Sequence, residues 1–440
     1  MCGYIVSLHI VTLEEDFGDV RPIGVVQQSA LEPIRADLED LVDLFEIEGK
    51  RLYLVGGLVR DLLGGYSIDN DVDITTDATP DLVKRLLKQW ARTVWTQGER
   101  FGTIGAQYRG RTIEITTHRS EAYLADSRQP IVEFSTAIED DLSRRDFTVN
   151  AMAVALPDLE LIDPFAGRAD LSAGLLRTPL DPMVSFSDDP LRMLRAARFS
   201  AGYALSPVAG LEDSISELRA RMEIVSRERI RDELEKLLKL HAPGAGLALL
   251  QRTRLLPFVV SGFRDDGPAA PFEVLDRLGR DMVVRFTALL APVAHDSATI
   301  HDELVGLRAS KRLVDEVSRT SAAWRALANV SMADDVVGAR RYLAAHGAYR
   351  KAACELAAAH DEPVGPGILA LLESVVDQEG LDSFRSPLDG HEVMSIIGAA
   401  AGPLVGAAIS HLLDQRFEEG PLSLERARYL VAEWWSGRVD

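Results

Sequence analysis

One segment, residues 54–76, constrains the fold of this chain more than any other stretch of its sequence. Its letters, LVGGLVRDLLGGYSIDNDVDITT, predict a strand that ends at Gly56 and Gly57, then a helix, and then a second strand that carries Asp71 and Asp73. Side chains alternate along a strand, so both aspartates face one side while their apolar neighbours point into a core. We therefore expect a small sheet that displays two carboxylates on one face.

This pair of carboxylates favours a metal site. Adjacent carboxylates raise each other's pKa, and hard divalent cations relieve the repulsion when they use both as ligands. Two ions held in this way can activate an attacking hydroxyl and stabilise a leaving pyrophosphate. We predict that Asp71 and Asp73 bind two Mg²⁺ ions, and that Glu114, on an alternating run further along the chain, is a third catalytic carboxylate.

The two glycines before the helix add a candidate phosphate site. Gly56 and Gly57 let the backbone approach a ligand closely and offer amides at a helix start, where a triphosphate can bind. Each feature alone has a structural explanation, since a Gly-Gly pair is usually a turn and aspartates at a strand end are usually solvated. Their order along the chain favours the functional interpretation.

The rest of the chain predicts two kinds of architecture. Apolar residues recur with helical spacing over residues 31–45, and Arg109-Gly110 is typical of a hairpin turn. After about residue 165 the sequence reads as successive amphipathic helices with no convincing strand. We predict an α+β fold, in which a small mixed α/β head precedes an elongated all-helical neck, body and tail. Short β patterns occupy residues 52–55, 72–74, 104–108 and 112–116.

Five parts are expected along the chain. They are an acidic N-terminal extension and helix (1–48), the catalytic head (49–170), a helical neck (171–245), a helical body (246–345) and a helical tail (346–440).

The glycine and aspartate segment resembles the signature of the polymerase-beta nucleotidyltransferase superfamily. Within it, VGGLVRDLL and DNDVDI resemble the class II (bacterial-type) tRNA nucleotidyltransferase and poly(A) polymerase family. The similarity covers the chain from about residue 50 to residue 240 and implies template-independent addition of nucleotides to RNA. It continues through RRDFTVNAMA (144–153), DPFAGRADL (163–171), DDPLRMLRAARF (188–199) and SRERIRDELEKLL (226–238).

The resemblance also implies roles for single residues. Arg145, Asp146 and Asn150 are expected to bind the ribose of the incoming nucleotide, although a surface ion pair would also explain the charges. Asp189 and Arg192 form an acceptor beside a donor, which matches the Watson–Crick edges of both C and A and rejects U and G. Further nucleotide or primer contacts are expected from Arg60, Arg195 and Arg198.

One departure from the family concerns the base-reading motif. The family usually has Glu-Asp at its start, whereas this chain has Asp188-Asp189. Helix capping alone would explain Asp189, so the capping and base-reading interpretations both stay open.

Charge and cysteine content restrict the partners and the compartment that we expect for this chain. The formal charge of −20 opposes nucleic-acid binding, but residues 51–240 carry 25 basic and 30 acidic side chains and are nearly balanced. We expect the tRNA 3′ end, CTP and ATP as partners, with neither DNA nor a membrane. Two distant cysteines, Cys2 and Cys354, indicate a reducing cytoplasm.

The specific reaction has alternatives. A CCA-adding enzyme is expected, with a bacterial poly(A) polymerase or a partial CC-adding or A-adding enzyme as alternatives, since all share the same chemistry. Residues 119–128 resemble the family's flexible loop, which favours addition of both C and A. In the body, Ala291 and Pro292 stand where a phosphohydrolase would have metal ligands, so no such activity is expected. Residues 402–406, GPLVG, are a candidate helix-start phosphate site for tRNA, or a simple packing turn.

Overall fold

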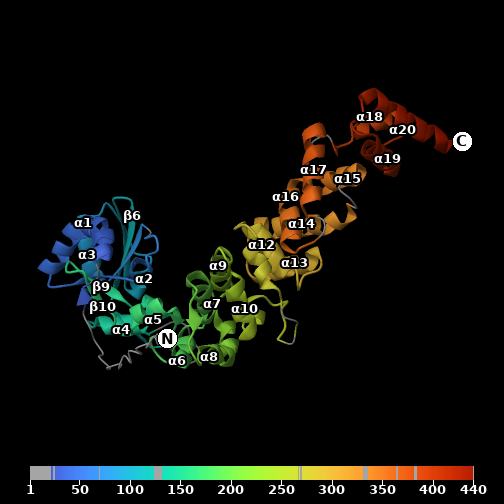
Figure 1. Cartoon of the computed structure of the whole chain (residues 1–440). Coiled ribbons are helices and arrows are strands. Elements are labelled where there is room, and N and C mark those ends of the chain that lie inside the picture. The colour runs from blue at the N-terminus through green and yellow to red at the C-terminus, as the bar shows by residue number, and fades with distance from the viewer. Residues whose placement is uncertain are drawn as a thin grey trace, which may run out of the picture. The chain divides into compact units, whose positions relative to one another are not determined.

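The computed structural model describes residues 21–22, 25–68, 70–122, 131–265, 267, 270–330, 335–362, 365–380 and 384–439. The chain separates into two compact units, Met1–Val225 and Ser226–Asp440. Figure 1 labels helices and strands of both units along the chain. The division falls within the segment 171–245 that was predicted as a neck. Of the predicted extension 1–48, residues 1–20 lie outside the described part.

The first unit is built on a mixed sheet, which confirms the predicted α/β head. Among the described residues it has eight strands in the order β1-β10-β9-β2-β3-β6-β5-β4. β3 pairs in parallel with β6, whereas β2 pairs antiparallel with both β3 and β9. The predicted hairpin turn at Arg109-Gly110 joins β5 and β6, and both residues have positive φ. The strands are β1 (Arg21–Pro22), β2 (Leu52–Val55), β3 (Asp71–Thr76), β4 (Thr93–Trp95), β5 (Thr103–Tyr108), β6 (Arg111–Thr117), β9 (Ala153–Leu156) and β10 (Glu160–Ile162).

Helices cover this sheet with the apolar stripes that the sequence predicts. α1 (Val25–Ile47) buries Leu31, Leu38, Leu41 and Phe45 completely, because apolar residues three or four apart share one helix face. They belong to the same core cluster as apolar side chains of the sheet and of α3. The other helices of the head are α2 (Gly57–Gly64), α3 (Pro80–Trp90) and α4 (Ile138–Ser143).

A helical layer completes the first unit and carries five of the thirteen residues that line the site described below. It contains α5 (Gly167–Ala173), α6 (Pro182–Asp188), α7 (Leu191–Tyr203) and α8 (Leu211–Leu218). Phe199 of α7 packs edge-on against Phe147 of the head, with ring centroids 5.3 Å apart. The expectation of no strand after residue 165 was wrong in one detail, since β11 (Leu175–Leu176) and β12 (Ser206–Pro207) form a short parallel pair. Two residues per strand are too few to produce an alternating pattern in sequence.

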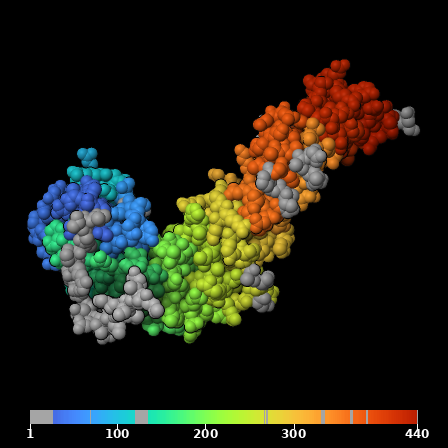
Figure 2. Space-filling view, in the orientation of Figure 1, coloured from blue at the N-terminus to red at the C-terminus, as the bar shows by residue number. Residues whose placement is uncertain are grey.

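All regular elements among the described residues of the second unit are helices, as predicted. Its last three helices bury one core that includes Val393, Leu412 and Val431, and they form the compact red block of Figure 2. In the described part of the chain, no helix combines the length and apolar character needed to cross a membrane. The helices are α9 (Arg227–Leu238), α10 (Gly244–Arg252), α11 (Leu256–Val259), α12 (Met282–Leu290), α13 (Ser297–Gly306), α14 (Lys311–Ala326), α15 (Val336–His346), α16 (Arg350–Ala359), α17 (Gly365–Glu379), α18 (Gly390–Ile397), α19 (Pro403–Glu419) and α20 (Leu424–Val439).

Candidate active site

The glycine turn between β2 and α2 lies at the base of the site. Gly56 has φ +72°, a conformation that side chains other than glycine rarely adopt. A Cβ atom added there would lie 3.2 Å from Nη1 of Arg145 and 3.6 Å from Oδ2 of Asp73. Glycine is therefore required for the turn, and a larger residue there would also crowd Nη1 of Arg145, which comes from a distant part of the sequence.

The predicted carboxylates share one face of the sheet. Asp71 and Asp73 are exposed on β3 while Val72 and Ile74 are buried, as the alternation predicts. The parallel register places Glu114 of β6 directly beside Asp73.

Desolvation by surrounding protein atoms and neighbouring charges shift the pKa of two of these carboxylates upward, although part of each side chain is exposed. Desolvation raises the pKa of Asp73; the Arg145 guanidinium opposes this rise and the Asp71 carboxylate adds to it. Desolvation, Asp73 and Asp71 all raise the pKa of Glu114. Among the described residues, no set of three or more His, Cys, Asp or Glu side chains is arranged to hold a metal ion by itself. A metal bound here would need further ligands, such as phosphate oxygens or water.

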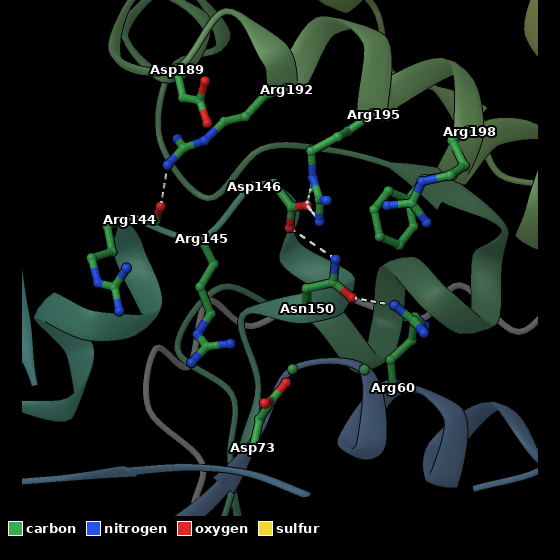
Figure 3. A pocket seen from close by; sticks show the side chains of 13 residues that line it. Arg60, Asp73, Arg144, Arg145, Asp146, Asn150, Asp189, Arg192, Arg195 and Arg198 are labelled. Atoms are coloured by element: carbon green, nitrogen blue, oxygen red, sulfur yellow. Dashed lines mark hydrogen bonds and ion pairs between the residues drawn. The ribbon is translucent and has the colours of Figure 1, made fainter. Parts of the chain in front are cut away.

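A cavity of about 410 Å³ opens above the glycine turn (Figure 3). Apart from Arg144 and Phe199, every residue that lines it belongs to the predicted site, whereas Asp71 and Glu114 are not among the lining residues. Six arginines and three aspartates give the lining a formal surplus of three positive charges, which suits an anion despite the acidic chain. The lining consists of Gly56, Gly57, Arg60, Asp73, Arg144, Arg145, Asp146, Asn150, Asp189, Arg192, Arg195, Arg198 and Phe199.

Two of these arginines share a carboxylate that the sequence analysis missed. Asp141, fully buried on α4, binds Arg144 at 2.5 Å and Arg145 at 3.1 Å. Burial opposes its ionisation, but the two guanidiniums outweigh that effect and lower the pKa of Asp141. The signal was present in the sequence, because Asp141 precedes the two arginines by three and four residues, the spacing of neighbours on a helix.

A chain of hydrogen bonds crosses the cavity wall (Figure 3). Nη1 of Arg60 donates to Oδ1 of Asn150 at 2.7 Å, and Nδ2 of Asn150 donates to Oδ1 of Asp146 at 2.8 Å. The other oxygen of Asp146 accepts from Nε of Arg195 at 2.8 Å. Burial alone would raise the pKa of Asp146, but Arg195 and Asn150 reverse this and lower it to about 2. Arg195, predicted to contact phosphates or primer, thus contacts the ribose-reading candidate Asp146.

The two residues predicted to read the base lie side by side at the start of α7 (Figure 3). Oδ1 of Asp189 accepts from the backbone amide of Leu191 at 3.2 Å, so its carboxylate contacts the helix start as the capping interpretation expects. Arg192 is buried; it donates to Oγ of Ser185 at 2.9 Å and to the backbone carbonyl of Arg144. Asp189 and Arg192 both line the cavity.

The remaining arginines rest on aromatic rings. Arg198 lies 4.5 Å from the ring centroid of Phe199, and Arg60 lies 4.1 Å from that of Tyr203. Such contacts hold a guanidinium in place while leaving its edges able to donate. The predicted loop at 119–128 lies partly outside the described residues, because 123–130 are not described.

Comparison with family models places two parts of the chain. Residues 52–177 match the model described as Poly A polymerase head domain. Residues 210–266 match the model described as Probable RNA and SrmB-binding site of polymerase A.

Curated relatives extend this match. A CCA-adding enzyme of Bacillus subtilis is 42% identical over 210 residues, which are 47% of this chain and 51% of that enzyme. A CCA-adding enzyme of Limosilactobacillus fermentum is 34% identical over 296 residues, 66% of this chain and 72% of that enzyme. The matched region thus spans about half the length of the Bacillus subtilis relative and more of the second.

Solved structures share the fold over nearly the whole chain. The Bacillus stearothermophilus CCA-adding enzyme in complex with CTP has a TM-score of 0.75 at 25% identity, covering 93% of this chain and 99% of that one. The Thermotoga maritima CCA-adding enzyme complexed with tRNA has a TM-score of 0.68 at 21% identity, covering 94% of this chain and 99% of that one, and shows the fold alone. From its site and these relatives, the chain belongs to the class II tRNA nucleotidyltransferase and poly(A) polymerase family.

Proposed function

We propose that this chain adds C and A from CTP and ATP to the 3′ end of tRNA, releasing pyrophosphate. The observation that carries this proposal is the cavity above Gly56, where Asp73 of the sheet faces Arg192 of α7 and Asp189, which precedes that helix, across a lining rich in arginine (Figure 3). A metal-binding carboxylate, an anion-binding wall and a donor-acceptor pair are the parts that such a reaction needs.

Asp71 and Asp73 are the residues that would hold Mg²⁺. Mg²⁺ in nucleotide enzymes is commonly bound by one or two carboxylates together with substrate phosphates and water, which fits a pair of acids without a complete protein cage. The raised pKa of Asp73 fits a carboxylate whose compensating charge comes from a ligand. Two bound ions would lower the pKa of the attacking hydroxyl and neutralise the leaving pyrophosphate. Glu114, beside Asp73, is proposed as the third catalytic carboxylate.

The protein's own groups bind and orient the nucleotide. The amide of Gly57 at the start of α2 and the guanidiniums of Arg144 and Arg145 would bind the triphosphate, since all three residues line the cavity. Asp146 is ionised at neutral pH because its pKa is lowered to about 2. Its oxygens accept from the backbone amide of Phe147, from Asn150 and twice from Arg195, so a ribose 2′-hydroxyl would bind Asp146 by replacing one of the bonds from Arg195.

The base would be read by Asp189 and Arg192. Asp189 accepts from the amino group of C or A, and Arg192 donates to the adjacent ring nitrogen, so the pair replaces a template. The CTP complex of the Bacillus stearothermophilus relative supports a nucleotide as the ligand.

The helical parts are proposed to hold the tRNA. Residues 171–245 would act as the neck that presents the base-reading helix, 246–345 as the body and 346–440 as the tail. The tail contains α19, whose start at Pro403 follows Gly402 and leaves helix-start amides that can bind a phosphate. Action on tRNA implies a cytoplasmic location, which the free, buried Cys354 also suits.

The test is addition to tRNA that lacks its 3′ CCA, with each NTP alone and in pairs in the presence of Mg²⁺, followed by sequencing of the products. The proposal expects CC from CTP, and CCA with a defined end when ATP is added. The match to the Poly A polymerase head domain supports one competing function. Long A tracts from ATP alone would establish that competitor, and a stop after CC or no addition without preformed CC would indicate a partial enzyme.

A further inference from the structure

Asp141 lies behind two arginines of the cavity rather than in it. Its Oδ1 accepts from Nε of Arg144 at 3.1 Å and from Nη2 of Arg144 at 2.5 Å, and its Oδ2 accepts from Nη2 of Arg145 at 3.1 Å. Each oxygen therefore holds one guanidinium. The carboxylate is fully buried, whereas about a fifth of each arginine side chain is exposed.

This arrangement leaves part of the Arg145 guanidinium able to bind a ligand in the cavity. Its Nη1 lies close to the glycine turn, within 3.2 Å of the position that a Cβ of Gly56 would occupy. Its Nε is buried and has no hydrogen-bond partner among the described residues. Asp141 occupies only Nη2, so the guanidinium is anchored from behind and can donate toward the cavity.

The net charge of Asp141, Arg144 and Arg145 distinguishes this group from a simple buried ion pair. One carboxylate between two guanidiniums leaves a surplus positive charge, and both arginines line the cavity. Buried pairs contribute little net stability, because the cost of desolvation offsets their attraction. A buried acid that organises two cavity arginines is better explained by the ligand they bind.

We propose that Asp141 is a positioning residue that fixes Arg144 and Arg145 for binding the nucleotide triphosphate. It does not touch substrate itself. The inference rests on the proposed function for the identity of the ligand, and it assigns a task to a side chain outside the cavity lining.

The same helix offers a matched control. Asp140 carries the same charge one residue earlier and is exposed, with Oδ2 accepting from Oγ of Ser135 at 2.5 Å. Asp140→Asn removes a charge from α4 without touching the arginines. Asp141→Asn removes the charge and places an amide donor against guanidinium donors, so the arginines lose their fixed orientation.

The experiment measures the KM for CTP, inhibition by inorganic tripolyphosphate, and the CTP to UTP efficiency ratio in single-nucleotide addition to tRNA. Asp141→Asn should raise the KM and the inhibition constant about tenfold or more, the scale of a lost charge-assisted hydrogen bond, while the CTP to UTP ratio stays within about twofold. Asp140→Asn should match the unmodified protein. Equal behaviour of the two variants overturns the inference, and so does a loss of base preference in parallel with triphosphate binding.

Asp141→Glu covers the case in which the asparagine variant does not fold. It keeps the charge between the arginines but displaces the carboxylate, so the melting temperature should be largely kept while tripolyphosphate inhibition weakens. Unchanged inhibition in a folded Asp141→Glu protein overturns the positioning role. If the unmodified protein adds no nucleotide to tRNA, the proposed function fails; if it adds nucleotides and these variants do not weaken triphosphate binding, the positioning role alone fails.

Discussion

Arg60 and Asn150 are ninety residues apart in sequence, and a 2.7 Å hydrogen bond from Nη1 to Oδ1 joins them in the wall of the cavity. This bond settles which way the amide of Asn150 points, since its Nδ2 must then face Asp146. The orientation of Asn150, one of the residues expected to bind the ribose, thus depends on Arg60, whose guanidinium stacks on Tyr203.

Asn150→Asp tests this dependence with almost no change in shape. The new carboxylate would face Asp146 across a 2.8 Å contact, replacing a donor with a like charge. We expect poorer discrimination between CTP and dCTP and a free energy of unfolding lower by about 1–3 kcal/mol. Asn329→Asp, at an exposed position, adds the same charge and should change neither quantity. Preserved sugar discrimination in a folded Asn150→Asp protein would exclude the amide from this role.

Asp73→Asn should separate chemistry from stability. Nucleotide addition should fall to a small residual level, because a metal ligand is lost. The melting temperature should stay level or rise, because the raised pKa of Asp73 means that its charged form is disfavoured in the folded state. Thermal melting and single-turnover addition check this together. Substantial residual activity would contradict the metal assignment.

Protonation of Asp146 at low pH should lower the free energy of unfolding. Its pKa falls from an ordinary 3.8 to about 2 on folding, so its ionised form stabilises the fold. This contribution, about 2 kcal/mol, is complete above the unfolded pKa and disappears as the pH falls toward 2. Urea unfolding between pH 5 and pH 2 should therefore show a shallower loss of stability in Asp146→Asn than in the unmodified protein. Parallel curves for the two proteins would contradict the lowered pKa.

The periodicity of apolar and polar residues predicts a structural feature correctly where the feature lies within one helix or one strand. Asp71, Asp73 and the buried stripe of α1 follow directly from such patterns. Asp141 was missed although its helical spacing was visible, because the arginine motif was interpreted without the helix before it.

Other contacts depend on tertiary packing that no local pattern contains. The bond from Arg195 to Asp146 exists only because α7 packs on the head, 49 residues away in sequence. The position of Glu114 beside Asp73 depends on a parallel pairing of strands that are not consecutive. Alternation predicts which face a side chain takes, but the order of strands in the sheet decides its neighbour.

The last prediction separates a protein template from a capped helix. Asp189 contacts the amide of Leu191 and also lines the cavity, so an alanine variant would confound the two roles. Asp189→Asn is the sharper change, because its Oδ1 can still accept from Leu191 while the second acceptor becomes a donor. Capping alone predicts unchanged base preference and a nearly unchanged melting temperature.

Base reading predicts a different result. An amide donor suits the carbonyl groups of U and G. The preference of Asp189→Asn for CTP and ATP over UTP and GTP should therefore shrink by about five- to over a hundredfold, corresponding to roughly 1–3 kcal/mol. Arg192→Lys should also reduce this preference, because an ammonium group cannot reproduce the fixed fork of the guanidinium. Arg198→Lys is the matched control on the same helix and should leave the preference ratio unchanged. The measurement is single-nucleotide addition with all four NTPs on tRNA ending at each successive position. Unchanged ratios in folded Asp189→Asn and Arg192→Lys proteins would leave Asp189 with only its contact at the helix start and remove the pair from base selection.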